Sequence, residues 1–345
     1  MICSISPTFE SVIAEYKPPF DRAMARRNMH LANLIAMEAA GLLFEHDASL
    51  ARLGMWREFF APLGKRYRAQ YQCYDFEVAD YQLYAISQSW SLLRGPRPKS
   101  ADIASGRYLT FLGAAQLFGR YQSASPAAAV ADGLGLACLN LSTGGSGPES
   151  YIDEEIVKLA NGGRAVVLQV LSGRSIGCDE YPGARHTRRP NDPGTKIDRL
   201  KLLGEIWSES RPEAKRLARK WQGRYVEVMS TLISRIEVPV LLAWVSTRSA
   251  DDWSIDRLDA AADFGSFPQL VDCEMVREIA PQCANFVDVS HDNGLPYGFT
   301  SRFTGEKCPV LRPNGTLSWK NDYYPSAEAG AALSSKIKSA LEEVL

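Results

Sequence analysis

The chain has 345 residues, and its 46% hydrophobic and 23% charged content is typical of a globular protein with a large buried core. Its 39 Lys and Arg residues balance 40 Asp and Glu residues, so the net charge of -1 provides no general attraction for nucleic acid or anionic membranes. No apolar run approaches the ~18–20 residues of a membrane-spanning helix and the N-terminus lacks the pattern of a signal peptide, so we expect a cytoplasmic protein without a membrane span.

The first 105 residues are rich in aromatic side chains and poor in strand patterns, which predicts a helical N-terminal region over residues 1–105. Apolar residues at helical spacing predict one helix over residues 21–46, with Asp21 as its N-cap, and a second helix over residues 49–61. Proline steps in residues 94–99 disfavour a helix and predict an extended linker.

From residue 106 to residue 345, short apolar runs alternate with helical stretches, as in buried parallel strands joined by crossover helices. Strands are predicted at residues 108–112, 136–142, 165–171, 239–245 and 285–290. Helices are predicted at residues 126–133, 149–161, 197–235, 269–280 and 326–344. This alternation predicts an α/β domain, a three-layer doubly wound sandwich with about five parallel strands.

Residues 172–238 form a basic insertion within this predicted domain. From Arg185 to Arg224 there are twelve Lys and Arg residues but five acidic residues. An apolar stripe along the predicted helix indicates that much of this charge is a solvated face. Arg188 and Arg189 remain candidates to contact a substrate, whereas the lack of a recognition motif argues against nucleic acid.

The candidate site follows from topology, because ligands of doubly wound sheets bind at the carboxyl ends of the strands. The loops expected there are residues 113–116, 143–147, 172–175, 246–248 and 291–293, and residues 321–324 are expected to close over them. Gly113 and Gln116 are candidate substrate-binding residues in the first loop. Gly144 and Gly145 offer backbone N–H groups that suit an anion or oxyanion, although an ordinary turn also explains them.

Side chains with chemistry are sparse in these loops. His291 is the best placed of the four histidines for general-base catalysis, and Asp322 is suited to orient a hydroxyl or accept a proton. Tyr324 is expected to bind substrate, because tyrosine is a poor base at neutral pH. Arg174 is a candidate to hold a sulfate or phosphate. A solvated loop histidine and an aspartate favoured by a helix dipole are the simpler interpretations of His291 and Asp322.

Seven cysteines are scattered along the chain, without a C-x-x-C pair or a histidine at the spacing of a zinc site. We therefore expect reduced thiols and no metal site, and the sequence identifies no cofactor. Cys178 is a weak candidate nucleophile, because no residue beside it in sequence would activate it.

Four blocks in the second part of the chain resemble the SGNH (GDSL-like) hydrolases in order and spacing. In that family the blocks carry Gly-Asp-Ser, Asn-x-Gly-x-x-Gly, Gly-x-Asn-Asp and Asp-x-x-His. The corresponding blocks are Phe111–Gly119, Asn140–Glu149, Leu171–Ser175 and Asn321–Gly330. The resemblance implies an SGNH-like domain over residues 106–345.

The catalytic positions of these blocks depart from the family pattern. Ala115 stands where the family has its nucleophilic serine, and Tyr324 stands where it has its histidine. Only a glycine donor, Gly145, and the acidic Asp322 match. The resemblance therefore implies the fold without the chemistry of a conventional serine esterase.

The whole pattern, including Arg188–Asp192 and Tyr323–Ser326, also resembles a family of alphaproteobacterial proteins with no established activity. Genes of that family lie near sulfotransferase and glycosyltransferase genes for surface polysaccharides, which implies a setting of carbohydrate modification. We therefore expect an intracellular transferase or esterase-like enzyme that acts on a carbohydrate or another small molecule. The alternatives are a non-catalytic protein that binds a glycan or a protein, and a sulfotransferase-like enzyme that uses a nucleotide sulfate. The sequence leaves open whether the chain forms a homo-oligomer.

Overall fold

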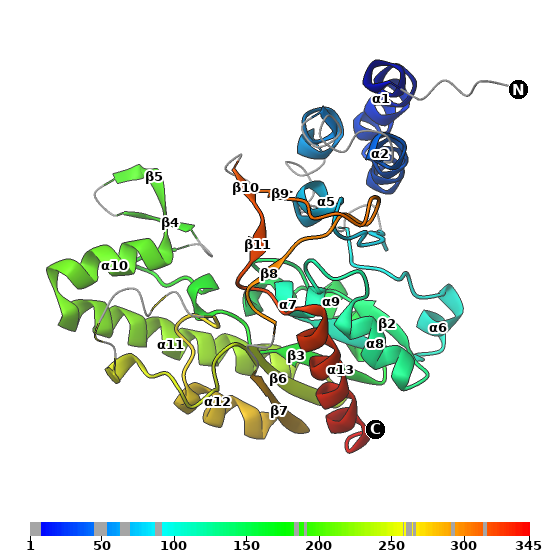
Figure 1. The fold of residues 1–345 in the computed structure, drawn as a ribbon. Coiled ribbons are helices and arrows are strands. Elements are labelled where there is room, and N and C mark those ends of the chain that lie inside the picture. Colours follow the sequence, from blue (N-terminus) through cyan, green and yellow to red (C-terminus); the bar gives the residue numbers. More distant parts are fainter. Residues whose placement is uncertain are drawn as a thin grey trace, which may run out of the picture. The chain divides into compact units, whose positions relative to one another are not determined.

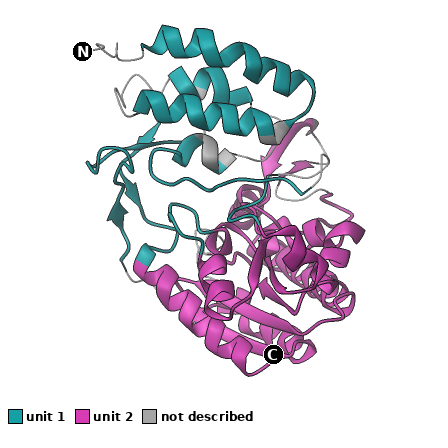
Figure 2. Cartoon of the chain, turned by 90° about the vertical axis from the view of Figure 1, so that its right-hand side faces the viewer, with its two compact units in different colours: residues 1–97, 119–125, 294–327 teal, residues 98–118, 126–293, 328–345 magenta. Residues whose placement is uncertain are grey.

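The computed structural model describes residues 8–44, 54–62, 70–86, 92–182, 186–189, 192–257, 259, 264, 267–290, 294–312 and 316–345. The chain divides into two compact units, each assembled from segments distant in sequence (Figure 2). Unit 1 comprises residues 1–97, 119–125 and 294–327, and unit 2 comprises residues 98–118, 126–293 and 328–345. The boundary expected between residues 105 and 106 stays a prediction.

Unit 2 is built around a five-stranded parallel sheet with the strand order β2-β1-β3-β6-β7 (Figure 1). Its strands are β1 (Tyr108–Leu112), β2 (Ala137–Asn140), β3 (Ala165–Gln169), β6 (Val240–Ser246) and β7 (Asn285–Ser290). Every residue of β1, β3 and β6 is buried, as expected for strands covered on both faces. All five predicted strands are confirmed, and their order is that of a doubly wound sheet.

Helices on both faces of the sheet complete three layers. On one face, Val130 of α8 (Pro126–Gly133) and Ile337 of α13 (Ala327–Glu342) belong to the same apolar cluster as Phe111 in β1. The other face carries α9 (Glu154–Asn161), α11 (Arg211–Ser234) and α12 (Cys273–Ile279). The Tyr108 hydroxyl donates to the Leu159 carbonyl in α9 at 2.7 Å, and that of Tyr225 in α11 donates to the Leu171 carbonyl at 2.8 Å.

The remaining helices of unit 2 are short. They are α6 (Ser100–Ala104), α7 (Ala115–Phe118), η2 (Pro148–Tyr151), η3 (Gly173–Ser175), η4 (Ile255–Arg257) and η6 (Ala280–Gln282). Two of them begin in the loops expected to form the site, α7 after β1 and η3 after β3, and η2 begins directly after the loop that follows β2.

The basic insertion contains a hairpin and two helices. In the hairpin, β4 (His186–Arg189) pairs antiparallel with β5 (Asp192–Asp198), and α10 (Arg199–Glu209) and α11 follow. The single helix predicted over residues 197–235 is therefore wrong at Ser210. This residue has an extended backbone, and its hydroxyl accepts a hydrogen bond from the Glu213 N–H, which caps the start of α11.

Unit 1 combines helices with two small antiparallel strand pairs. Its helices are α1 (Phe9–Ala25), α2 (Met29–Phe44), the π-helical turn η1 (Trp56–Phe60) and α5 (Gln70–Asp75). One strand pair joins β8 (Tyr297–Gly298) to β11 (Lys320–Asn321), and the other joins β9 (Val310–Leu311) to β10 (Leu317–Ser318).

The helix predicted over residues 21–46 is two helices. The first begins at Phe9, where the Thr8 hydroxyl accepts a hydrogen bond from the Ser11 N–H, so Asp21 lies inside α1 and is not its cap. Arg27 then adopts a positive φ of 56° and turns the chain before α2. The described part of the second predicted helix, residues 54–61, is helical, and the rest lies outside the described residues.

The segment predicted as a linker is anchored at its first residue. The Arg94 guanidinium is buried 4.6 Å from the centre of the Tyr81 ring, and its Nη2 donates to the carbonyls of Gln122 and Ser123, both at 2.9 Å. Residue 94 is therefore part of the packing of unit 1. Among the residues that the structure describes, no helix combines the length and apolar character needed to cross a membrane.

Candidate functional site

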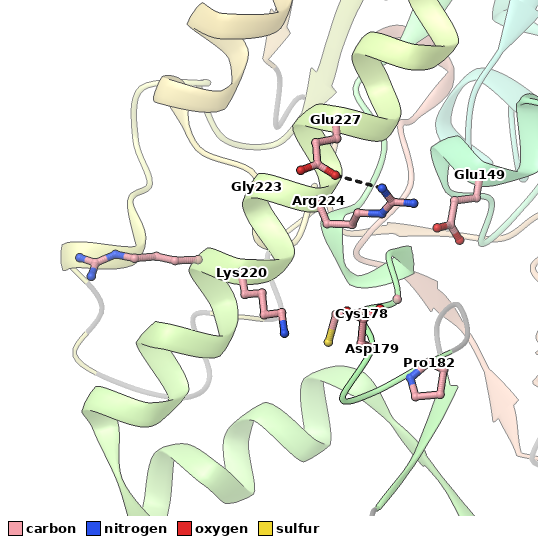
Figure 3. Close-up of a pocket in the computed structure, with 10 residues that line it drawn as sticks. Glu149, Cys178, Asp179, Pro182, Lys220, Gly223, Arg224 and Glu227 are labelled. Carbon is pink, nitrogen blue, oxygen red and sulfur yellow. Dashed lines mark hydrogen bonds and ion pairs between the residues drawn. The ribbon is translucent and has the colours of Figure 1, made fainter.

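A pocket of about 640 Å³ opens in unit 2 beside the long helix α11 (Figure 3). Its walls come from three places: the turn after β2, the segment that follows η3, and one face of α11. The lining residues are Glu149, Gly177, Cys178, Asp179, Pro182, Arg219, Lys220, Gly223, Arg224 and Glu227. The cavity thus joins loop residues from the carboxyl ends of two strands to the basic insertion.

The amphipathic pattern of α11 decides which of its side chains reach the pocket. Trp221 and Tyr225 are fully buried on the apolar stripe of the helix. Lys220 and Arg224 each precede one of these residues by one position. One position is a rotation of ~100° around an α-helix, so both side chains lie on its polar face. In Figure 3 the Arg224 guanidinium extends from α11 toward Glu149.

The cations of the pocket are already paired with carboxylates. The Lys220 Nζ lies 2.9 Å from Glu180, and the Arg224 Nη1 lies 2.9 Å from Glu227. Arg219 is paired with Asp256. The hydrogen bond from Lys220 is the main cause that lowers the pKa of Glu180. A ligand with strong negative charge would compete with these partners.

Two carboxylates of the pocket have no such partner. Within the described part of the chain, neither Glu149 nor Asp179 makes a hydrogen bond or an ion pair through its side chain. Both are exposed to solvent. Their oxygens are therefore available as hydrogen-bond acceptors for a ligand.

A hydrogen bond from a buried indole holds the Cys178 thiol in the wall of the pocket. Its sulfur accepts a hydrogen bond from the Trp221 indole Nε1 at 3.1 Å. The buried Arg199 guanidinium stacks 4.8 Å from the centre of the same indole and donates twice to the Tyr181 carbonyl at 3.2 Å. Burial lowers the pKa of Arg199, and the negative charge of nearby Glu149 counteracts that effect.

Gly113 and Gln116, the predicted binding residues of the first loop, are buried and engaged within the protein. The Gly113 carbonyl accepts hydrogen bonds from the Tyr151 hydroxyl at 2.5 Å and the Thr143 N–H at 3.0 Å. The Gln169 side chain accepts from the Ala114 N–H at 2.8 Å and donates to Gln116 at 3.2 Å. Gln169, the last residue of β3, therefore fixes the loop that follows β1.

The second loop is more open. Gly145 is exposed with a positive φ of 76°, and Gly144 beside it is half-buried, so backbone N–H groups here remain near solvent. Ser146 is 2% exposed, and its hydroxyl has no hydrogen-bond partner among the described residues. Gly147 packs directly on Ser175, which would lie 2.3 Å from an added Cβ, so the loops after β2 and β3 meet.

The predicted arginines are not gathered around one point. Arg174 is half-buried in η3. Arg188 is exposed in β4, and Arg189 forms an ion pair with Glu205 at 2.5 Å, each side chain 37% exposed. None of these three arginines lines the pocket of Figure 3.

The remaining predicted residues fall in unit 1 or outside the description. Asp322 is exposed, and Tyr324 is half-buried, where its hydroxyl accepts a hydrogen bond from Arg120 Nη1 at 3.0 Å. Both belong to unit 1, so their expected approach to the loops of unit 2 stays a prediction. His291 lies outside the described residues, so its expected role in general-base catalysis stays a prediction.

Sequence reasoning missed the two available carboxylates. Glu149 looked like the start of a helix, and Asp179 had no motif around it. Both lie within a few residues of loops that were expected at the carboxyl ends of the strands. The expectation that ligands bind at these strand ends was therefore the signal that could have found them. In the parts of the chain that can be described, no group of three or more His, Cys, Asp or Glu side chains could hold a metal ion.

The chain belongs to the family described as "Domain of unknown function (DUF6473)", whose model matches residues 70–192 and 199–305. A solved structure of an active-site mutant of a family two carbohydrate esterase from Clostridium thermocellum, in complex with "celluohexase", is similar at 12% identity and a TM-score of 0.35. The match covers 73% of this chain and 66% of that one, and a TM-score of this size does not establish a shared fold. No curated protein matches the sequence.

Proposed function

We propose that the protein is a carbohydrate-modifying enzyme and that the pocket beside α11 binds the sugar. The observation that carries this proposal is the balance of the lining, three carboxylates (Glu149, Asp179, Glu227) and three cations (Arg219, Lys220, Arg224). A sugar hydroxyl both donates and accepts hydrogen bonds, so adjacent acceptors and donors of this kind match a polyhydroxylated ligand.

The same balance favours a hydroxyl-rich ligand over a nucleotide sulfate. A nucleotide sulfate carries several negative charges and needs unpaired cations, but Lys220 and Arg224 are each bonded to a carboxylate. Among the described residues, the acceptors Glu149 and Asp179 form no ion pair, and they would repel such a donor. The sulfotransferase alternative therefore has less support from this pocket.

The chemistry that suits these residues is direct transfer to or from a sugar hydroxyl. Ala115 supplies no nucleophile, so a covalent serine intermediate of the SGNH type is not available there. A carboxylate in the pocket can instead accept the proton of the attacking sugar hydroxyl or water as its oxygen bonds to the acyl carbon of the donor. The bond from that carbon to the thiol sulfur or sugar oxygen of the donor then breaks, and the leaving group takes the proton from the carboxyl group. Glu149 and Asp179 are the candidates, because neither side chain makes a hydrogen bond or an ion pair among the described residues.

The second candidate is a protein that binds a glycan without modifying it. Its support is Ala115, which is 5% exposed in α7 and leaves this loop without a reactive side chain. The two proposals share the binding step and differ in turnover.

Binding can be tested by titrating the full chain with neutral hexasaccharides of glucose, galactose and mannose. We expect Glu149→Gln and Asp179→Asn to weaken binding about five- to tenfold, because a hydrogen bond to a charged group contributes ~1.5–3 kcal/mol before solvent reduces it. Asp132→Asn, an exposed carboxylate on α8, is the matched control. A bound sugar should also slow iodoacetamide alkylation of Cys178 but not of Cys273 on α12.

Turnover separates the two candidates. The enzyme should release acetate from acetylated oligosaccharides or move an acetyl group from acetyl-CoA to a hexasaccharide, and both reactions should fall in the variants that bind less. Binding without either reaction supports the non-catalytic protein. If the hexasaccharides neither bind nor protect Cys178, the pocket does not take a neutral sugar.

A further inference from the structure

Unit 1 exposes three large apolar side chains within one short strip of chain, residues 317–323. Leu317 is 53% exposed, Trp319 is 57% exposed and Tyr323 is 38% exposed. Each of these side chains therefore keeps a large part of its surface in contact with water. Large apolar side chains that stay exposed along one short segment point to an interaction site.

A buried asparagine holds this strip in shape. Asn321, 3% exposed, accepts hydrogen bonds from the N–H groups of Tyr323 at 3.3 Å and Tyr324 at 3.0 Å, and its amide donates to the Tyr324 carbonyl at 2.7 Å. Lys320 and Asn321 also pair with β8. The loop that presents Tyr323 is therefore preorganised before any ligand arrives.

Packing behind the loop also fixes the Tyr323 ring. The Tyr323 ring lies edge-on to Tyr324, with centroids 4.9 Å apart. Tyr324 in turn receives a hydrogen bond from Arg120 and lies 5.6 Å from the Tyr121 ring. Tyr323 is thus the outermost ring of an aromatic cluster whose inner members are anchored in unit 1.

The polar neighbours of the rings carry opposite charges. Lys320 and Asp322 are both exposed, and each is adjacent in sequence to one of the two rings. The strip therefore carries one donor and one acceptor next in sequence to the two rings, and it has no net charge of its own.

We propose that residues 317–323 bind a neutral oligosaccharide, with Trp319 and Tyr323 stacking on the apolar faces of its sugar rings. A pyranose has C–H groups on its faces and hydroxyls around its edge, so it matches rings flanked by Lys320 and Asp322. This inference rests on the proposed function in taking a carbohydrate as the ligand, and it adds a second contact surface in unit 1.

Other occupants fit the strip less well. A stable protein interface buries ~800 Å² on each partner, which is far larger than one strip of seven residues interrupted by charged side chains. Single-stranded nucleic acid also stacks on aromatic rings but needs a positive groove, whereas this strip contains Asp322 and the chain has a net charge of -1.

The test uses the full chain on an array of hexasaccharides of glucose, galactose, mannose and N-acetylglucosamine, with a peptide and a single-stranded oligonucleotide as further probes. We expect Trp319→Ala and Tyr323→Ala each to weaken binding to the best hexasaccharide about five- to tenfold, and Trp319→Phe to restore part of it. Leu34→Ala, which removes a side chain that is 49% exposed on α2, should leave binding unchanged.

Each result decides the inference. Unchanged hexasaccharide binding in Trp319→Ala and Tyr323→Ala, with melting temperatures equal to that of the wild type, overturns it while leaving the pocket proposal standing if Glu149→Gln still weakens binding. Loss of peptide or oligonucleotide binding in the same variants, without a sugar effect, also overturns it. A wild-type chain that binds no hexasaccharide overturns both proposals.

Discussion

The Arg120 guanidinium donates two hydrogen bonds to the Asp75 carboxylate, from Nε at 2.9 Å and from Nη2 at 3.2 Å. The Asp75 side chain is fully buried, and that of Arg120 is 12% exposed. The Tyr81 hydroxyl adds a third hydrogen bond to the carboxylate at 2.8 Å. The pair joins α5 to residues 119–125, a segment that belongs to unit 1 although its neighbours in sequence lie in unit 2.

Removing both members of this pair should cost less than the sum of the two single losses. Arg120→Met leaves a buried carboxylate without its cation, and Asp75→Ala leaves a buried guanidinium, so each should lower the free energy of unfolding by about 3–5 kcal/mol. The double variant should lose less than the sum of the two. Urea unfolding measures all three, and Lys338→Met, which breaks an exposed pair with Glu342, is the control. Additive losses would show that the pair is not coupled.

Tyrosine burial in unit 1 predicts a loss of stability at high pH. Burial raises the pKa of Tyr297 from 10.0 to about 12. Between these values the folded chain keeps the phenol proton that the unfolded chain releases, so stability is full below pH 10 and falls as the pH rises to 12. Tyr297→Phe should therefore lose less stability than the wild type across this window, measured by urea unfolding at pH 9, 10, 11 and 12. Parallel curves for both chains would contradict the prediction.

Gly113 is constrained by packing rather than by a ligand. An added Cβ would lie 2.8 Å from the Gln169 Oε1 and 2.9 Å from the Leu117 Cδ1, and Gln169 is the group that holds the Ala114 N–H. Gly113→Ala should destabilise the chain by about 1–3 kcal/mol in thermal or urea unfolding. Gly41→Ala, at a helical position with nothing within 4 Å, should be neutral or stabilising by about 0.5–1 kcal/mol. If the stability of Gly113→Ala equalled that of the wild type, packing would not explain this glycine, and it would again be a candidate to contact a ligand.

The sheet was predictable because its strands are short apolar runs between loops, fully buried in β1, β3 and β6, and that pattern does not depend on distant residues. The break at Ser210 also had a sequence signal, since a serine followed by Pro212 marks a helix start. The turn at Arg27 had a weaker signal, because no glycine or proline stands there. Only Asn28, whose side chain accepts a hydrogen bond from the Leu31 N–H, marks the start of the next helix.

The candidate pocket was harder to predict because it depends on tertiary packing. Glu149 and Arg224 line the same cavity although 75 positions separate them in sequence. The rule for strand ends selects the loop before Glu149, and charge counting selects the insertion that contains Arg224. Neither rule indicates that these two segments meet. That Glu149 makes no ion pair with the described residues is also a property of the folded chain.

Asn321 should control the local stability of the loop that presents Tyr323. In Asn321→Ala, the N–H groups of Tyr323 and Tyr324 lose their side-chain acceptor, and amide hydrogen exchange at both positions should accelerate about two- to tenfold, since a typical hydrogen bond contributes ~0.5–1.5 kcal/mol. Asn321→Asp keeps the acceptor oxygen but loses the donor to the Tyr324 carbonyl, so exchange at Tyr324 should change less than in the alanine variant. The Ser142 N–H, which Asn140 caps in unit 2, should exchange equally in all three chains. If exchange at Tyr323 and Tyr324 were the same in Asn321→Ala as in the wild type, the loop would owe its shape to the β8–β11 pairing instead.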